Sequence, residues 1–264
     1  MDDETKDSHF ASAAQRQARL LGHLRTEMFA DAQALKDALG VSIATVRRDL
    51  TELEARGLLK RMHGGAAIIN QATRDHVVSV REEINAAEKA RIGAAAAEMI
   101  VDGDAIMIDS GTTSLQVAKH LAGRPSLTFV TNGTDTLTQL VAGGHKDVHL
   151  IGGKYIEINR SLGGPAAIEA IRTFSVDTAI LSVAAVDLKR GVIATVGPEV
   201  GAVQQAMIEI ARTVIVVADN SKFDRTALSV IAPLKNIDHI VTDEKTRPLV
   251  ASLSSELQAK FIFV

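Results

Sequence analysis

The stretch VSIATVRRDL contains two adjacent arginines, Arg47 and Arg48, just after a small hydroxylated turn. The apolar residues Val46, Leu50 and Leu53 recur with i, i+4, i+7 spacing, which predicts a helix with one buried face. The two arginines then project away from that face. A helix that enters the major groove needs small or hydroxylated residues at its start, and arginines for guanine edges or phosphates. The spacing therefore predicts a helix able to contact a DNA duplex.

The predicted DNA contacts lie at the start of this helix and on the hairpin that follows it. They are Ser42, Ala44, Thr45, Arg47, Arg48, Lys60, Arg61 and His63. A short R-R-D run is usually only a solvated charged surface. Here it follows a Gly-Val-Ser turn and precedes a hairpin, which favours DNA binding. The whole chain has net charge −3, but residues 8–74 hold ten Lys or Arg against six Asp or Glu.

A second group of polar residues follows the apolar run AIMID, where the chain continues as SGTTS. The N–H groups of a glycine-containing turn, a helix N-terminus and three hydroxyls form a nest for an anion, and phosphate is the natural guest. Ordinary glycine-turn and N-cap chemistry is the alternative for this motif alone. Other predicted strands also end in polar residues, and ligands of open parallel sheets lie beyond the carboxyl ends of the strands.

The predicted effector contacts are therefore the residues that follow these strands. They are Asp109, Ser110, Gly111, Thr112, Thr113, Ser114, Asn132, Gly152, Gly153, Asp187 and Lys222. A small polyol phosphate would suit them. Neither G-x-x-x-x-G-K-[ST] nor a strand-linked G-x-G-x-x-G occurs, which argues against a nucleotide.

Several classes of site and location are disfavoured by composition. The chain has no cysteine, which excludes disulfides, thiolate metal sites and a cysteine nucleophile. His145 and His149 straddle Asp147 at the start of a strand and share no helical face, so we predict no metal site. We also predict no cofactor. The acidic start MDDETKDSHF lacks the features of a signal peptide, and no apolar run approaches about 20 residues, so we expect a cytoplasmic protein without membrane association.

The elements that must position these residues fall into two domains. Helices are predicted from Gln15 to about Leu24, from Ala32 to Leu39 after the cap Asp31, and from the cap Ser42 to about Ala55. A hairpin around Gly64-Gly65 completes a winged helix-turn-helix. The predicted ranges are a disordered acidic tail at 1–11, the DNA-binding domain at 12–69, a linker at 70–85 and an effector-binding domain at 86–264.

The larger domain is predicted to be α/β. Short, nearly continuous apolar strands alternate with helices, which indicates a mainly parallel sheet covered by helices on both faces. The predicted strands are 105–109, 127–132, 147–153, 178–187, 213–219, 239–243 and the terminal FIFV, with a last helix from about Pro248 to Lys260.

Residues 41–66, VSIATVRRDLTELEARGLLKRMHGGA, resemble the helix-turn-helix signature of DeoR-type bacterial transcriptional regulators. The resemblance implies that Ser42, Thr45, Arg47 and Arg48 contact DNA and that residues 61–65 belong to the wing. One departure is Ala34, where such proteins often have Glu. We also predict a homo-oligomer, a dimer or tetramer, bound to a double-stranded operator, because two such domains about one helical turn (~34 Å) apart compensate for the modest positive charge of each.

The later motifs EKARIG, DSGTTS, VTNG, LIGG and ADNSKF resemble, in order, the effector domain of the same family, which is related in fold to ribose-5-phosphate isomerase. The resemblance implies a phosphorylated sugar or polyol that relieves repression of a catabolic operon. At the family's charged positions this chain has Val200, Gln204 and Gln205, which leaves the identity of the effector open.

An isomerase-like enzyme is the alternative, because that fold also supports aldose-ketose isomerisation. Such a reaction needs a carboxylate base and groups that stabilise an enediolate. The isomerases resemble D-G-A-D-E where this chain has AAVDLK, which leaves Asp187 as a lone carboxylate, and they carry a Glu-Lys step where this chain has VQQAM. We therefore predict binding without turnover.

Overall fold

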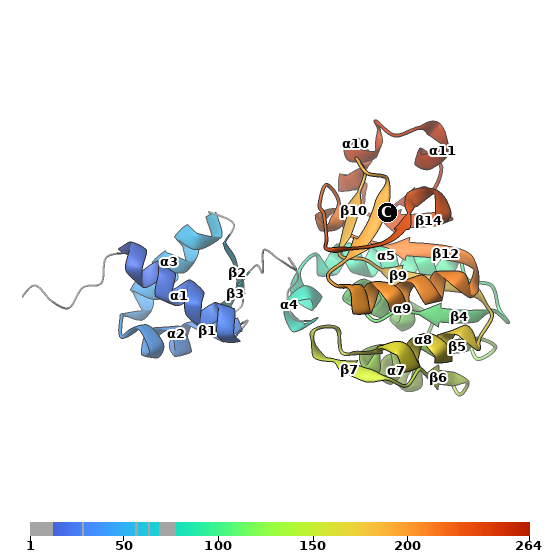
Figure 1. Cartoon of the computed structure of the whole chain (residues 1–264), viewed down its shortest axis with the longest axis horizontal. Coiled ribbons are helices and arrows are strands. Elements are labelled where there is room, and N and C mark those ends of the chain that lie inside the picture. The colour runs from blue at the N-terminus through green and yellow to red at the C-terminus, as the bar shows by residue number, and fades with distance from the viewer. Residues whose placement is uncertain (1–12, 28, 56–57, 63, 69–77) are drawn as a thin grey trace, which may run out of the picture. The chain divides into compact units, whose positions relative to one another are not determined.

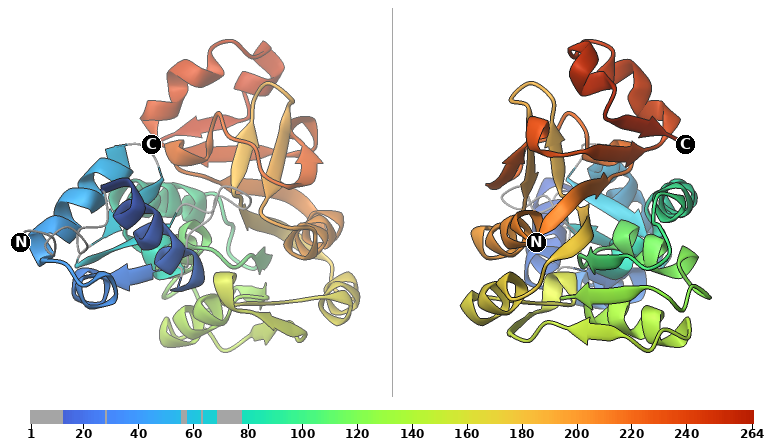
Figure 2. Two further views of the ribbon diagram at one scale, coloured as in Figure 1. Left: turned by 60° about the vertical axis from the view of Figure 1, so that its left-hand side comes forward. Right: turned by 90° about the vertical axis from the view of Figure 1, so that its right-hand side faces the viewer.

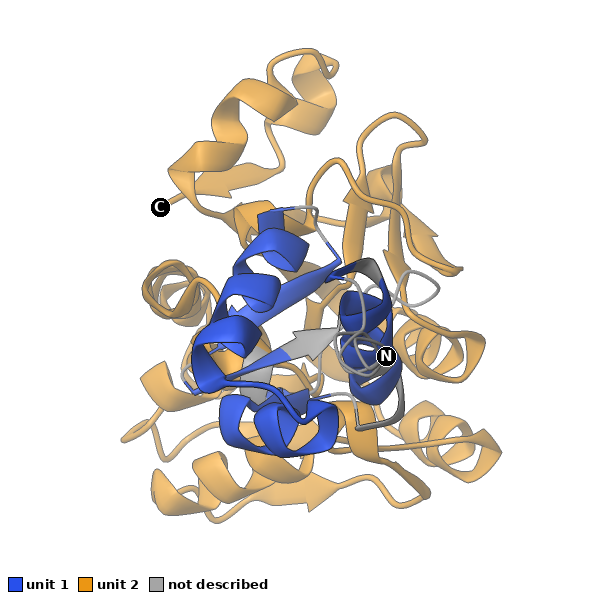
Figure 3. Ribbon diagram, turned by 90° about the vertical axis from the view of Figure 1, so that its left-hand side faces the viewer, with its two compact units in different colours: residues 1–80 blue, residues 81–264 orange. Residues whose placement is uncertain are grey.

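The chain forms two units in the computed structural model, which describes residues 13–27, 29–55, 58–62, 64–68 and 78–264. Figure 3 colours the first unit, residues 1–80, and the second, residues 81–264. Each unit encloses its own hydrophobic core, as expected of a domain. The predicted acidic tail, 1–11, lies outside the described residues.

The N-terminal unit contains three helices and a three-stranded antiparallel sheet among its described residues (Figure 1). Its elements are α1 (Ala13–Glu27), β1 (Phe29–Asp31), α2 (Ala32–Leu39), α3 (Ile43–Ala55), β2 (Leu59–Met62) and β3 (Gly65–Ile68). Both predicted caps are present. The Asp31 side chain accepts a hydrogen bond from the Ala34 N–H at 2.7 Å, and Ser42 Oγ accepts one from the Thr45 N–H at 3.1 Å. The helix starts are thus fixed by local sequence.

The core of this unit lies between the three helices and the sheet. On α3, Val46, Leu50 and Leu53 are buried, which confirms the predicted helical face. They pack in one cluster with residues of the other elements, which are Leu20, Leu24, Ala30, Leu35, Leu39, Leu59 and Ala66. The opposite face of α3 is left exposed.

The wing forms from β2 and β3 where the sequence predicts a hairpin. Its two glycines are needed for different reasons. Gly64 has φ +86°, which favours glycine, whereas Gly65 lies in β3 opposite Asp31. A Cβ on Gly65 would lie 2.3 Å from the carbonyl oxygen of Ala30. The sequence does not predict β1, and it is the close approach of β1 that requires a glycine there.

The C-terminal unit is built on a seven-stranded sheet in which every neighbouring pair is parallel, in the order β15-β14-β12-β9-β4-β5-β6. The strands are β4 (Ala105–Ile108), β5 (Thr128–Thr131), β6 (Val148–Leu150), β9 (Val176–Ser182), β12 (Ala211–Val217), β14 (His239–Thr242) and β15 (Phe261–Phe263). The longer helices are α5 (Ala86–Glu98), α6 (Thr112–His120), α7 (Thr134–Ala142), α8 (Pro165–Arg172) and α9 (Pro198–Glu209). The predicted α/β fold class is confirmed.

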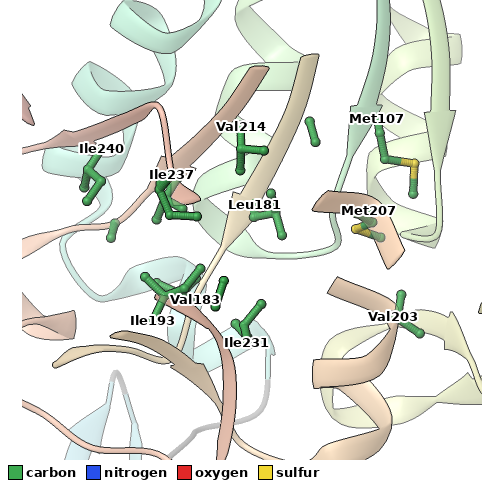
Figure 4. Packing of buried hydrophobic residues seen from close by; sticks show 14 of the residues in the cluster. Met107, Leu181, Val183, Ile193, Val203, Met207, Val214, Ile231, Ile237 and Ile240 are labelled. Carbon is green, nitrogen blue, oxygen red and sulfur yellow. The ribbon is translucent and has the colours of Figure 1, made fainter. Parts of the chain in front are cut away.

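Helices cover both faces of this sheet, as the right-hand view of Figure 2 shows. Alternate residues of β4 divide between the faces: Met107 packs in the cluster with α8 and α9, and Ile106 and Ile108 pack in the cluster with α5, α6 and α7. Figure 4 shows Met107 near Met207 and Val203 of α9. A sheet buried on both faces explains the nearly continuous apolar runs of its strands.

The prediction of one strand over 178–187 is wrong. The chain leaves the large sheet after β9 and forms β10 (Ala185–Asp187) in a second, antiparallel sheet with β11 (Val192–Thr195) and β13 (Ser229–Pro233). Residues on either side of the break are equally buried, so the apolar run contains no signal of the change. The helix predicted near 248–260 is instead two short ones, α10 (Arg247–Val250) and α11 (Ser255–Gln258).

A short helix, α4 (Val78–Glu83), lies within the range 70–85 that the sequence assigns to a linker. Residues 70–77 of that range are outside the described part of the chain. None of the described helices is both long and apolar enough to cross a membrane.

Candidate functional site

The exposed face of α3 carries Arg47 and Arg48, and no ion pair joins either to a described acidic residue. Ala44 beside them is exposed and small. The Ser42 and Thr45 hydroxyls lie 2.9 Å apart at the helix start, in a hydrogen bond that leaves both near the surface. The structure thus places four of these predicted DNA contacts in the first two turns of α3 and the fifth, Ser42, directly before it.

Asp49, the acid that follows the arginine pair, points the other way. It is 1% exposed, and its carboxylate accepts hydrogen bonds from Arg16 Nε at 2.5 Å and Nη2 at 3.0 Å. The hydrogen bond to Asp49 raises the pKa of Arg16 against the opposing effect of desolvation. Gln17 on α1 also donates to Asp49, at 3.4 Å. Asp49 is therefore neutralised by α1 and does not compensate the charge of Arg47 and Arg48.

The wing contributes Lys60 and Arg61, both exposed. Arg61 Nη1 donates to Thr51 Oγ1 at 2.8 Å, which ties the wing to α3. A groove of about 340 Å³ lies between the wing and α3. Its lining residues are Ala32, Arg47, Leu50, Arg61, Met62, Gly64 and Gly65. The predicted contact His63 lies outside the described residues.

In the C-terminal unit, the turn between β4 and α6 is held by side chains from the neighbouring strands. Asn132 Oδ1, after β5, accepts from the Ser110 N–H at 3.2 Å, and Ser182 Oγ, at the end of β9, accepts from the Ser114 N–H at 3.0 Å. A Cβ on Gly111 would lie 2.6 Å from Cβ of Ser182, so only glycine allows this approach.

Two donors of this turn remain available. The N–H groups of Thr112 and Thr113, the first of α6, have no hydrogen-bond acceptor among the described residues. Helix N-termini of this kind bind anions through such groups and through the helix dipole. The Ser114 hydroxyl is bonded to Ser182 Oγ at 2.7 Å and is therefore less available than the sequence predicts.

The predicted Gly152 and Gly153 lead into a hairpin of β7 (Lys154–Ile156) and β8 (Ser161–Gly163), joined by the turn η1 (Glu157–Asn159). This hairpin is hydrogen-bonded to the turn after β5. The Leu162 N–H donates to the Asn132 carbonyl at 2.8 Å, and Asn132 Nδ2 donates to the Leu162 carbonyl at 3.1 Å. Asn132 thus contacts both the hairpin and the turn between β4 and α6.

Asp187 does not follow a strand of the parallel sheet, so that part of the prediction is corrected. It ends β10, and its Oδ1 accepts from the Arg190 N–H at 3.0 Å. The error follows from treating β9 and β10 as one strand. An isolated bridge between Val186 and Phe223 places β10 beside the turn η2 (Asn220–Lys222), which carries the predicted Lys222.

The carboxylate that does follow a parallel strand near Lys222 is Asp219, after β12. Its Oδ1 accepts from Asn85 Nδ2 at 2.6 Å and from the Ser221 N–H at 3.0 Å. Burial would raise the pKa of Asp219, but the charges of Lys222 and Lys89 and these hydrogen bonds outweigh it and lower the pKa. Asp219 therefore stays ionised.

Among the described residues there is no cluster of three or more His, Asp or Glu side chains that could hold a metal ion. The groups that could bind a molecule at the carboxyl-terminal edge of the parallel sheet are the N–H donors, hydroxyls and isolated carboxylates described above.

Comparison with known proteins places both units in one family. Residues 16–72 match the DeoR-like helix-turn-helix domain, and residues 84–244 match the DeoR C-terminal sensor domain. The transcriptional repressor AccR of Agrobacterium fabrum (strain C58) is 45% identical over 253 residues, which cover 96% of this chain and 98% of that protein. The chain belongs to the DeoR family.

Other similarities are more distant. A putative aga operon transcriptional repressor of Escherichia coli O157:H7 is 30% identical to this DeoR-family chain and covers 92% of it and 90% of its own length. Ribose 5-phosphate isomerase A of Methanocaldococcus jannaschii is 14% identical, with a TM-score of 0.40 over 53% of this chain and 55% of that one. The relatives are repressors, which confirms the prediction of a regulator rather than an enzyme.

One electrostatic feature of this DeoR-family chain involves a position noted as a departure from the family pattern. Gln204 of α9 donates from Nε2 to Asp109 Oδ2 at 2.7 Å. Asp109 is 1% exposed. Burial raises the pKa of Asp109 to about 7, against hydrogen bonds from Gln204, Ser182 and Ser110 that lower it. No Lys, Arg or His within the described part of the chain forms an ion pair with this carboxylate.

Sequence analysis missed the two residues that hold Asp109. Gln204 Nε2 also donates to the Ser182 carbonyl at 2.7 Å, and the Ser182 N–H donates to Asp109 Oδ2 at 3.3 Å. The departure VGAVQQ was the only available signal for Gln204. Ser182 was hidden within the predicted strand 178–187, although it is the one polar residue of that strand's apolar middle.

The raised pKa of Asp109 predicts a pH-dependent stability. A carboxyl with a raised pKa binds its proton more tightly in the folded chain than in the unfolded chain, so the folded state loses stability as the pH rises from about 4 to about 7. Replacing Asp109 with Asn should remove this loss. We expect Asp109→Asn to be more stable than the native chain at pH 8 by on the order of 4 kcal/mol, from about three pKa units at about 1.4 kcal/mol each, and we expect this gain to shrink towards pH 5.

Chemical denaturation from pH 5 to pH 8 measures this difference. The exposed Glu256 supplies the matched control, because Glu256→Gln makes the same carboxylate-to-amide change at the surface and should leave the profile unaltered. A stability difference between Asp109→Asn and the native chain that stays constant over this range would contradict the raised pKa.

Proposed function

We propose that this chain is a cytoplasmic, homo-oligomeric repressor of a sugar or polyol catabolic operon. It binds a double-stranded operator through α3 and the wing, and a phosphorylated sugar or polyol in the C-terminal unit releases it. The proposed DNA contacts are Ser42, Ala44, Thr45, Arg47, Arg48, Lys60, Arg61 and His63. The proposed effector contacts are the residues from Asp109 to Ser114 together with Asn132, Gly152, Gly153 and Lys222.

The observation that supports DNA binding is the difference in exposure between three consecutive residues on α3. Asp49 is buried with Arg16, and Arg47 and Arg48 are exposed. Two uncompensated guanidinium groups at the start of a helix match the edges of guanine and the phosphate backbone. Sequence specificity from so few contacts requires two units bound about one helical turn (~34 Å) apart, which is why we propose a dimer or tetramer.

The proposal that an effector binds in the C-terminal unit rests on the hydrogen-bond donors at the start of α6. The Thr112 and Thr113 N–H groups and the helix dipole favour an anion, and Lys222 supplies positive charge in the turn after β12. A phosphate monoester is a suitable anion because its oxygens accept several hydrogen bonds at once.

A route from this site to the DNA-binding unit begins at Arg81 in α4, just after the undescribed residues 69–77. Arg81 Nη2 donates to the Ile158 carbonyl at 2.8 Å and to Asn159 Oδ1 at 2.9 Å, both in η1 of the β7–β8 hairpin. The same hairpin is bonded to Asn132. We propose that effector binding shifts the hairpin, which moves α4 and thereby the spacing of the two DNA-binding units. This shift requires unequal effector affinity for the two states.

The proposed DNA contacts predict the effect of a substitution on operator binding. Arg48→Ala should weaken it by about 1–3 kcal/mol and relax discrimination at one base pair if Arg48 contacts a guanine. Gel-shift titration against the operator and its single-base variants measures both effects. The exposed Arg19 on α1 is the matched control, because Arg19→Ala removes the same charge from the same unit. Equal, sequence-independent losses for the two variants would remove Arg48 from the interface.

The experiment that tests effector binding screens several ligands by thermal shift and then measures whether a binder releases the protein from the operator. Thermal-shift screening with glycerol 3-phosphate, ribose 5-phosphate and glucose 6-phosphate should detect a binder that also releases the operator. Thr112→Glu, which places a carboxylate at the start of α6, should bind the operator but not respond. The exposed Thr138 on α7 is the control, as Thr138→Glu. If the effector concentration that releases the native chain also released the Thr112→Glu variant, the proposed site at the start of α6 would be refuted.

The coupling route makes a separate prediction. Arg81→Ala should leave operator affinity unchanged and raise the effector concentration needed for release by about tenfold, because two hydrogen bonds of the route are lost. Gel shifts with increasing effector measure this midpoint. Arg172 forms exposed ion pairs with Glu169 and Glu209, so Arg172→Ala is the matched control. An unchanged midpoint for Arg81→Ala would place the route elsewhere.

A further inference from the structure

Two buried acceptor atoms at the edge of the parallel sheet have no hydrogen-bond partner among the described residues. They are Oε1 of Gln204 and Oδ2 of Asp219. The two residues are 2% and 0% exposed. Buried polar atoms are almost always paired, so an unpaired atom requires an explanation such as a role in binding.

The orientation of the Gln204 amide is fixed by its other end. Nε2 donates to Asp109 Oδ2 and to the Ser182 carbonyl, both at 2.7 Å. A flipped amide would place Oε1 against these two acceptors, so the unpaired atom is the oxygen. Because Oε1 is bonded to the same carbon as Nε2, it lies beside Asp109 and Ser182.

Both of these neighbours border the turn between β4 and α6, where we propose that the anion binds. Asp109 begins the turn, and Ser182 Oγ holds the Ser114 N–H at its end. Asp219 lies at the same edge, since Val217, two residues before it, pairs with Ser182 in the register of β12 and β9. The start of α6 therefore offers unpaired donors, and Gln204 and Asp219 offer unpaired acceptors at the same edge of the sheet.

We propose that Gln204 is a specificity-determining residue whose Oε1 accepts a hydrogen bond from a hydroxyl of the effector, with Asp219 Oδ2 as a second acceptor. The ligand class is a polyhydroxylated monophosphate, with its phosphate at the start of α6. Acceptors without donors match hydroxyl groups and repel a second phosphate or a carboxylate. This inference rests on the proposed function, because it requires a phosphate in that turn.

Isothermal titration calorimetry with matched ligands tests the proposal. Methyl phosphate carries the phosphate alone, and glycerol 3-phosphate, ribose 5-phosphate and glucose 6-phosphate add hydroxyls. The measured quantity is the affinity for the tightest polyol phosphate divided by that for methyl phosphate. Gln204→Lys keeps a donor for Asp109 and removes the acceptor, and Gln204→Met removes both. Both variants should lower this ratio about tenfold, the loss of one buried hydrogen bond.

The neighbouring residue on α9 is the matched control. Gln205 donates to the carbonyls of Val230 and Ile231 in β13, so Gln205→Met removes the same kind of group away from the turn and should keep the native ratio. Asp219→Asn replaces the other unpaired oxygen by a donor and should also lower the ratio. It supplies an independent variant if thermal unfolding shows that a Gln204 variant is not folded.

The outcomes separate this proposal from the phosphate site itself. If every ligand binds but the Gln204 variants keep the native ratio, a water molecule satisfies Oε1 and the proposal is overturned while the phosphate site stands. An equal fall in Gln205→Met would also overturn it. If the native chain binds no phosphate ester, methyl phosphate included, the proposed effector site fails and the inference with it.

Discussion

Parallel strands that end in register leave backbone groups beyond the last rung of the sheet without partners, and the residues that follow must satisfy them. In this chain a side chain from a neighbouring strand end does so at three positions. Asn132 accepts from the Ser110 N–H, Ser182 accepts from the Ser114 N–H, and Asp243 accepts from the Asn220 N–H at 2.7 Å. The few polar atoms of this edge that stay unpaired are the ones on which the proposed effector site rests.

In the N-terminal unit, too, the pairing of polar side chains decides which charges reach the surface. Successive residues on a helix point about 100° apart, so a three-residue motif spans most of the circumference. Arg47 and Arg48 consequently remain exposed while Asp49 reaches the buried face and pairs with Arg16. An acidic chain, with net charge −3, can in this way present a locally basic surface.

What the sequence could predict follows from the range of the interactions involved. Helix starts such as Asp31 and Ser42 depend on contacts three residues away, and they were predicted to the residue. The helical face of α3 and the alternation of strands with helices also follow from local periodicity. The break between β9 and β10 was missed because both sides are buried, and Asp187 was misplaced with it. Strands β1, β11 and β13 are short and carry little pattern of their own.

The least predictable part is the contact set of Asp109. Gln204 is 95 residues away in the sequence, so no window of neighbouring residues contains this pair. The amide could be noticed only as a departure from a family pattern, and its partner could be found only from the packing of α9 against the end of β9. Arg16 and Asp49, 33 residues apart, illustrate the same limit in the smaller unit.

The magnitudes constrain how an effector could switch such a protein. Moving a two-state equilibrium from 1:99 to 99:1 requires about 5.5 kcal/mol of differential affinity, whereas one hydrogen bond contributes about 0.5–1.5 kcal/mol. A single ligand contact is therefore insufficient, and several bonds must change together. The β7–β8 hairpin meets this requirement, because two bonds join Leu162 to Asn132 and two join the Arg160 carbonyl to Thr134. On the route proposed above, these four bonds form or break together, so a small shift at Asn132 would carry a free-energy difference to α4.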